Sequence, residues 1–453
     1  MEKTATLQVG FARVNVNPQM GMEMRGYYQS RRAIGVLDDL ELNVVAVNHG
    51  DDTVLIMALD NCNMPTDFAL QLRKAISEKT NVPTDAIYIH SIHTHTGPDL
   101  AYGYDEEADN LITIYRAFLV TRFVDACTFA IADLKPAKMG YGVGQAPNIA
   151  FIRRFWMKDG SVRTNPGVNN PDILEPIGKL DESVYVMRFD RENAKSVTVV
   201  NFACHPDTVG GCYLSADWPG FARRFVEKAI EDTYCIFFNG AEGDVNHVNV
   251  RPKGGDFNDL EEGFDGCSRG YGHARHMGRV VAGAVMQVYD KVNYQPVDSV
   301  KYMQQYVDIP ANVPNKEDMP IARKYHELHQ AGKDNEIPYD GMMLTTVIAE
   351  AERMIRLENA PLNFSLLFSA IKIGNVAMFG IPGEPFNGVA RAISEKNDLG
   401  MVMTTCMTNA AEGYYPTQDA YDQGGYEAKA SNFKAGVAEK MVEVGLSMIE
   451  KMK

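Results

Sequence analysis

The sequence predicts an α/β protein built from layers of strands and helices. Short apolar runs of strand length alternate along the chain with longer segments of helical periodicity. With 45% hydrophobic and 23% charged residues among 453, the chain has the composition of a globular protein and can bury a large core. It has no internal repeat and no low-complexity linker, so we expect one large domain over residues 1–453.

The first third of the chain predicts strands, a helix and a further strand in that order. Alternating apolar residues indicate strands over 40–47 and 53–59. A helical pattern begins after Pro65, and a short apolar strand over 86–92 leads into a turn rich in histidine. A long helix is then expected over 105–134.

The remaining elements continue this alternation. We expect strands over 184–189, 197–204 and 235–238, a helix over 273–288, two helices within 320–357, a hairpin over 364–379 and a last helix over 433–451. Residues 251–272 are rich in Gly and acidic side chains and are expected to form a surface loop. Active-site residues of α/β proteins gather where strands end in loops, so these strand ends are the first places to search.

Charge and composition exclude several classes of function. The chain has 44 Lys and Arg against 59 Asp and Glu, a net charge of −15, so we expect no nucleic acid partner. No apolar run approaches the roughly 20 residues of a spanning helix, so no stable membrane insertion is expected. Seven cysteines without a CxxC pair and an N-terminus without a signal pattern favour a cytoplasmic protein, or a secreted one whose signal peptide has been removed. The pattern does not indicate an oligomeric state.

Histidines follow two of the predicted strands: His90, His93, His95 and His205. Because alternate residues of an extended chain face the same side, the imidazoles of His93 and His95 can share a site. Neutral imidazole is the commonest metal ligand, so the pattern favours a transition-metal centre.

A catalytic zinc centre needs about three or four ligands with an open position for water. Glu384, which follows Pro382 and Gly383, can supply a carboxylate at a predicted strand end. Glu242 and Asp244 are equally placed after another strand, and periodicity does not choose among the three.

Five further motifs follow one another along the chain. They are Ile92-His93-Thr94-His95-Thr96-Gly97-Pro98, Asn201-Phe202-Ala203-Cys204-His205-Pro206, Ser215-Ala216-Asp217-Trp218-Pro219-Gly220, Asn239-Gly240-Ala241-Glu242-Gly243-Asp244-Val245 and Pro382-Gly383-Glu384. In this order they resemble the neutral, alkaline, non-lysosomal ceramidase family, and the resemblance runs from Val9 to Glu427. The resemblance implies a single catalytic domain with mixed sheets and flanking helices. It also implies Zn2+-dependent hydrolysis of the amide between a fatty acid and a sphingoid base.

By the same resemblance, Zn2+ would be bound by His93, His205, Glu384 and Tyr414. Tyr415 directly follows Tyr414, so the sequence leaves open which of the two tyrosines is the ligand.

The resemblance also implies catalytic and substrate-binding residues. His95 would hydrogen-bond the reacting carbonyl or the leaving group, and Tyr426 would offer a hydroxyl to the pocket. Arg153 or Arg154 would bind the substrate.

Two departures from the family pattern shape the functional hypothesis. The family's serine after Gly243-Asp244-Val245 is replaced by Asn246. The next residue, His247, is either an added acid or base or a turn histidine, and we expect it to face solvent. An amide side chain cannot form an acyl-enzyme, so we expect water to be the nucleophile and Asn246 to position the substrate. The family's C-terminal β-sandwich domain is expected to be absent.

We therefore expect a zinc-dependent hydrolase that cleaves an amide bond of a small molecule more soluble than ceramide. The alternatives are an esterase or lactonase, or a non-catalytic descendant that binds a ligand. Segments 100–112, 155–180 and 251–272 are expected to form the pocket walls, and they do not specify the acyl or leaving group.

Overall fold

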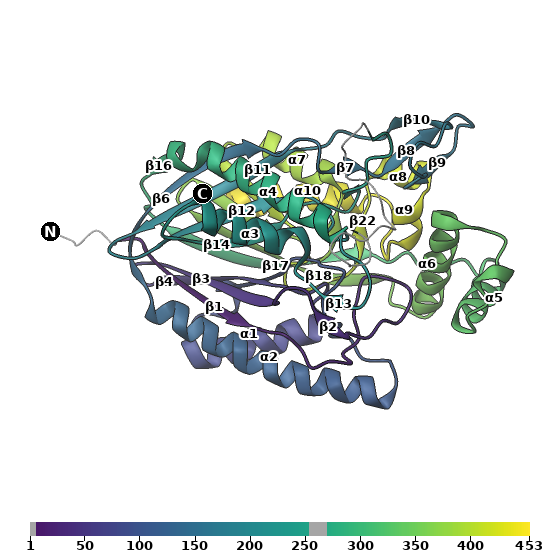
Figure 1. Cartoon of the computed structure of the whole chain (residues 1–453), viewed down its shortest axis with the longest axis horizontal. Coiled ribbons are helices and arrows are strands. Elements are labelled where there is room, and N and C mark those ends of the chain that lie inside the picture. Colours follow the sequence, from purple (N-terminus) through teal and green to yellow (C-terminus); the bar gives the residue numbers. More distant parts are fainter. Residues whose placement is uncertain (1–5, 253–269) are drawn as a thin grey trace.

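The structure, a computed structural model, describes residues 6–252 and 270–453 and has a nine-stranded sheet at its centre (Figure 1). The strand order is β14-β12-β11-β6-β1-β3-β4-β5, with β16 paired to β6. The strands are β1 (Gln8–Asn15), β3 (Glu41–His49), β4 (Asp52–Leu59), β5 (Ile87–Ser91), β6 (Lys135–Gln145), β11 (Ser183–Arg191), β12 (Ser196–Phe202), β14 (Thr233–Asn239) and β16 (Asn293–Gln295). β4 and β5 pair in parallel, as do β12 and β14, and the other pairs are antiparallel. The sheet is therefore mixed, as the family resemblance implies.

A four-stranded sheet in the order β17-β18-β19-β21 forms the second layer. Its strands are β17 (Val300–Pro310), β18 (Asn363–Ile373), β19 (Val376–Gly380) and β21 (Met401–Thr405). The hairpin expected over 364–379 is confirmed as β18 and β19, which turn at Gly374 with a φ of +53°. Shorter strands are β2 (Gly35–Val36), β7 (Phe151–Ile152), β8 (Arg154–Met157), β9 (Val162–Thr164), β10 (Ile173–Pro176), β13 (Tyr213–Leu214), β15 (Val245–Asn246), β20 (Glu384–Pro385) and β22 (Tyr414–Tyr415).

Helices flank both sheets (Figure 1). They are α1 (Thr66–Thr80), α2 (Glu106–Ala132), α3 (Asp217–Ala229), α4 (Tyr271–Val288), α5 (Met319–Gln330), α6 (Gly341–Leu357), α7 (Asn387–Lys396), α8 (Gln418–Gln423), α9 (Tyr426–Ala430) and α10 (Val437–Lys451). α2 packs on β1 and β3 with α1 beside it, whereas α3 and α4 pack on each other and on β14 and β6. α5 and α6 pack together at the right edge of the view. No helix in the described part of the chain is long and apolar enough to cross a membrane.

Strand β18 contributes to two hydrophobic cores. Ile371 belongs to the large core of the nine-stranded sheet, whereas Phe368 belongs to a second core with residues of α7 and α10. Adjacent side chains of a strand point to opposite faces, so one strand can serve both cores. The second sheet is thus packed on both sides.

The fold brings the ends of distant strands together. β5 and β14 are the outer strands of the nine-stranded order, yet the Asn239 N–H donates to His90 Nε2 at 2.9 Å. The His90 Nδ1–H donates in turn to the carbonyl of Cys406, directly after β21, at 2.8 Å. The loops that follow these three strands therefore begin side by side.

Candidate metal centre

His93 lies in the turn that follows β5 and is 4% exposed. Its Nδ1 lies 3.1 Å from the carbonyl oxygen of Cys62, so Nδ1–H donates there and Nε2 is left for another partner. The backbone N–H of His93 donates to Asn61 O at 3.0 Å, and its φ of +70° is unusual for a side-chain-bearing residue. The main chain thus fixes the ring before any ligand binds.

His205 is held in the same way after β12. Its Nδ1 lies 2.8 Å from the carbonyl oxygen of Glu242 and 3.0 Å from that of Val245, which leaves Nε2 for another partner. His205 is 1% exposed, and the Trp218 indole N–H donates to its carbonyl at 3.3 Å. Burial, with the nearby Arg153, lowers the pKa of His205 below its ordinary value.

Glu384 enters the centre from the second half of the chain. It lies on β20, which pairs in parallel with β22 so that Glu384 is opposite Tyr414. Gly243 packs directly on this strand, because a Cβ there would lie only 2.5 Å from the Glu384 carbonyl oxygen. Burial alone would raise the pKa of the Glu384 carboxyl, but His93 and His205 hold it well below its ordinary value.

These donors converge on one point. Glu384 Oε2 lies 3.1 Å from His205 Nε2 and 3.5 Å from His93 Nε2. His93, His205, Glu242 and Glu384 each offer a ligand atom, and these atoms all lie within 4.8 Å of one another. With the Nδ1–H groups of both imidazoles bonded to carbonyls, two lone pairs and a carboxylate face the same space and repel unless positive charge lies between them. Nitrogen and oxygen donors in this number suit Zn2+, so the residues fit the metal that the resemblance implies.

His95 lies beside the centre. Its Nε2 is 3.3 Å from His93 Nε2, and its Nδ1 is 3.4 Å from Asp207 Oδ1. Cys62, His93 and His95 form a second group of donors within 4.8 Å of one another. Since the Nδ1 of His93 donates to a carbonyl, the group that contains Glu384 is the better metal site.

Tyr414 and Tyr415 point to different surroundings. The Tyr414 ring stacks on His205 with a centroid distance of 6.4 Å, whereas the Tyr415 hydroxyl donates to Pro382 O at 2.9 Å in the second core. Tyr426, at the start of α9, packs edge-on against Tyr414, and its hydroxyl lies 2.9 Å from that of Tyr28. Tyr414 therefore lies beside the donors of the centre, with Tyr426 against it, whereas Tyr415 does not.

Arg153 and Arg154, which the sequence does not separate, make different contacts. The Arg153 guanidinium donates to Glu427 Oε1 at 2.8 Å and to Gly243 O at 2.7 Å, and lies 5.5 Å from the Tyr414 ring centroid. Arg154 donates to Gln423 and Gly424 and lies over Phe386. Arg153 is therefore the arginine beside the candidate centre.

Both ends of the Asn246 side-chain amide form hydrogen bonds within the protein. Its amide N–H donates to Asn165 Oδ1 at 2.9 Å, and its Oδ1 accepts the Val248 N–H at 3.0 Å. The expectation that His247 faces solvent is wrong: the residue is 2% exposed and its ring lies 5.3 Å from that of His273. Packing of α4 against this loop buries it, a tertiary contact that a local turn pattern does not show.

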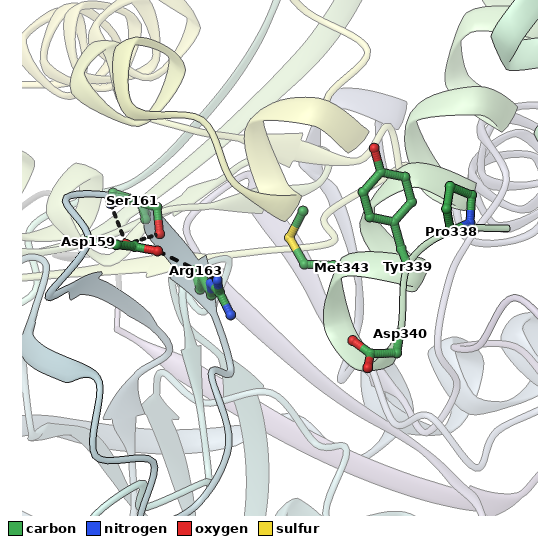
Figure 2. Close-up of a pocket in the computed structure, with 8 residues that line it drawn as sticks. Asp159, Ser161, Arg163, Pro338, Tyr339, Asp340 and Met343 are labelled. Atoms are coloured by element: carbon green, nitrogen blue, oxygen red, sulfur yellow. Dashed lines mark hydrogen bonds and ion pairs between the residues drawn. The ribbon is translucent and has the colours of Figure 1, made fainter.

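A surface hollow of about 670 Å3 lies away from the metal donors. Figure 2 shows Asp159, Ser161 and Arg163 on one side of it, with Tyr339, Asp340 and Met343 opposite. The first group belongs to the segment 155–180 that the sequence predicts as a wall, whereas the segment 100–112 does not line the hollow. In the expected wall 251–272, residues 253–269 lie outside the described residues.

Several residues at the centre carry no sequence signal of their own. Tyr28 lies in an irregular segment, and Asp207 follows the His205-Pro206 pair without any periodic pattern. Glu427 adjoins Tyr426 in sequence, but its pairing with Arg153 depends on α9 meeting the junction between β7 and β8. Only the three-dimensional arrangement identifies these residues.

Two solved structures have this fold. The neutral ceramidase from Pseudomonas aeruginosa matches with a TM-score of 0.70 at 16% identity, over 99% of this chain and 75% of that one. A ceramidase complexed with C2 matches with a TM-score of 0.70 at 15% identity, over 99% of this chain and 76% of that one. No family model and no curated protein matches the sequence. The chain therefore has the neutral ceramidase fold, as its motifs imply.

Proposed function

We propose that this protein is a zinc-dependent hydrolase that cleaves an amide bond of a small molecule more soluble than ceramide. The observation that carries the proposal is the convergence of two imidazole lone pairs and a buried carboxylate at one point. Both similar structures are of ceramidases, and their fold supports an amide bond as the target.

His93, His205 and Glu384 would hold the ion, with Tyr414 beside His205 as the expected fourth ligand. When bound, zinc supplies Lewis-acid polarisation of a carbonyl and makes water a competent nucleophile near neutral pH. The carbonyls of Cys62, Glu242 and Val245 orient the two imidazoles for this task.

The surrounding side chains supply proton transfer and orientation. His95 Nε2 faces the centre and can take a proton from water or give one to the leaving nitrogen, while Asp207 lies on the other ring nitrogen. The Tyr426 hydroxyl, paired with Tyr28, offers a donor to the developing oxyanion. Arg153 packs over Tyr414 and Tyr426 and keeps both rings in place.

Asn246 contributes through its loop rather than as a nucleophile. Its amide carries no hydroxyl for acyl transfer, and both ends of that amide bond Asn165 and Val248. We infer that Asn246 stabilises the pairing of β15 with β7, which lies between His205 and Arg153. Attack by water fits this arrangement better than a covalent route.

The preference for a soluble substrate rests on charge. The net charge of −15 disfavours approach to anionic membrane surfaces. The hollow in Figure 2 has charged and apolar residues in its lining and lies away from the metal donors, so the substrate preference does not rest on it.

A substrate panel tests the proposal. Wild type and His205→Ala are assayed with soluble N-acyl compounds, the matching esters and lactones, and long-chain ceramide in detergent, with and without a chelator. We expect wild type to cleave a soluble amide faster than the other substrates, and the chelator to inhibit this cleavage. His205→Ala should not cleave the amide. Ceramide as the best substrate would contradict the proposed substrate class, and cleavage of esters or lactones alone would contradict the amide. Ligand binding without any turnover would identify a non-catalytic descendant.

A further inference from the structure

We propose that Glu242 is a further protein ligand of this metal centre, so that two carboxylates and two imidazoles bind the ion. The inference deepens the proposed function, on which it rests for the presence of a metal. It concerns a residue that neither the family resemblance nor the sequence pattern selects.

Glu242 is a buried carboxylate without a hydrogen-bonding partner. The residue is 0% exposed, and neither carboxylate oxygen accepts a hydrogen bond from the described part of the chain. The Cys406 thiol lies beside this carboxylate, and a thiol is a weak donor. Burial of a carboxylate in such surroundings is costly unless a cation or a strong donor faces it.

Protein cations near Glu242 are already bonded elsewhere. Arg153 donates to Glu427 and to the carbonyl of Gly243, the residue after Glu242. His205 directs its Nδ1–H to the main-chain carbonyl of Glu242 and not to its carboxylate. His93 lies beside Glu242 but also contacts Glu384 at 3.5 Å, so one imidazole faces two carboxylates. A bound divalent cation would compensate both charges.

The distances place the Glu242 carboxylate within reach of the same ion as the other donors. Its ligand oxygen lies within 4.8 Å of those of His93, His205 and Glu384, which suits donors that each lie about 2.0–2.2 Å from one zinc ion. The Val245 N–H donates to Glu242 O at 2.8 Å, and the Gly243 N–H to Pro385 O at 2.9 Å. These bonds fix the backbone that carries the side chain.

Charge balance also favours two carboxylates. Two neutral imidazoles, Glu242, Glu384 and one divalent cation sum to zero, and a neutral group is cheaper to bury than a charged one. Catalytic zinc sites sometimes expand to five ligands, so four protein ligands leave a position for water. In this inference Glu242 takes the fourth protein position in place of Tyr414, which the family resemblance implies.

Metal affinity tests the inference directly. Chelator competition with Zn2+, and titration with Co2+ followed by its visible absorption, are run on wild type, Glu242→Gln, Tyr414→Phe and Asp244→Asn. Asp244 is the matched control, because it is buried in the same loop but its carboxylate accepts the Asn387 N–H at 2.7 Å. We expect Glu242→Gln to weaken Zn2+ binding by roughly 100-fold or more, since even the loss of a supporting group around a ligand costs 10–100-fold. Its Co2+ spectrum should also change, whereas Asp244→Asn should keep the wild-type affinity and spectrum.

Unchanged affinity and Co2+ spectrum in Glu242→Gln, with a loss in Tyr414→Phe, would overturn the inference in favour of the tyrosine. If Glu242→Gln does not fold, the anomalous signal of zinc in wild-type crystals decides, with a Glu242 oxygen expected about 2.0–2.2 Å from the ion. A zinc ion far from that oxygen would refute the ligand role while leaving the proposed function intact. Absence of any zinc site in wild type would contradict both the inference and the proposed function. Zinc bound by Glu242 in a protein without hydrolytic activity would contradict only the proposed function.

Discussion

His90 and His93 lie on either side of the end of β5, and the structure uses them in opposite ways. His90 bonds the backbone through both ring nitrogens, donating to Cys406 O and accepting from the Asn239 N–H. His93 bonds the backbone only through Nδ1, at Cys62 O, and its Nε2 faces Glu384. One imidazole joins three strand ends, and the other leaves a nitrogen for a ligand.

The difference shows how to separate structural from ligand histidines in a buried cluster. Each neutral imidazole has one donor and one acceptor, so a ring whose two nitrogens both contact the main chain has nothing to offer a metal. His205 follows the pattern of His93, since its Nδ1 is held by two carbonyls and its Nε2 lies 3.1 Å from Glu384. The count of backbone contacts therefore assigns His93 and His205, but not His90, to the centre.

The largest expected effect is on turnover. His93→Ala and His205→Ala should each lower hydrolysis by about 1000-fold or more, because the Lewis acid is lost with its ligand. Their metal-free melting temperatures should stay near that of the metal-free wild type. Kinetics on the best amide substrate measure turnover, and circular dichroism measures the melting temperatures. Retained turnover in either variant would contradict the assignment of its histidine as a metal ligand.

His90→Ala should instead affect stability. It leaves the Asn239 N–H without its imidazole acceptor and the Cys406 carbonyl with Thr408 as its side-chain donor, which we expect to destabilise the fold by about 1 to 3 kcal/mol. Urea unfolding measures this loss, and zinc binding by the folded variant should persist. A stable His90→Ala that no longer binds zinc would reverse the assignment.

The burial of His90 also predicts how the stability of the protein depends on pH. Burial lowers the pKa of His90 to about 3 from its ordinary 6.5, so the unfolded chain binds a proton below pH 6.5 that the folded chain refuses. The free energy of unfolding should therefore fall as pH drops from about 6.5 towards 3, with no contribution from His90 above that range. Unfolding of wild type and His90→Ala at several pH values should show a shallower decline in the variant, and equal slopes would contradict the assigned pKa.

Sequence patterns anticipate the long elements better than the contacts between them. The expected helix over 105–134 is α2, and the two within 320–357 are α5 and α6. Periodicity could not choose Glu384 over Glu242, because that choice depends on β20 meeting the loop after β14. Tyr415 is buried by the second core, a long-range packing effect that its neighbour Tyr414 does not share.

The smallest expected effect concerns Asn246. Because its amide bonds Asn165 and Val248, we expect Asn246→Ser to lower turnover by about 10-fold, less than the loss of a donor to the transition state. Intact mass measured during turnover should show no acyl-enzyme in wild type or variant. A trapped covalent intermediate on any serine would contradict attack by water.

The metal content of freshly purified protein tests the central claim most directly. Elemental analysis should find about one zinc per chain in wild type and in folded His90→Ala, and little in His93→Ala and His205→Ala. Wild type without any transition metal, or zinc content unchanged in both His93→Ala and His205→Ala, would contradict the account.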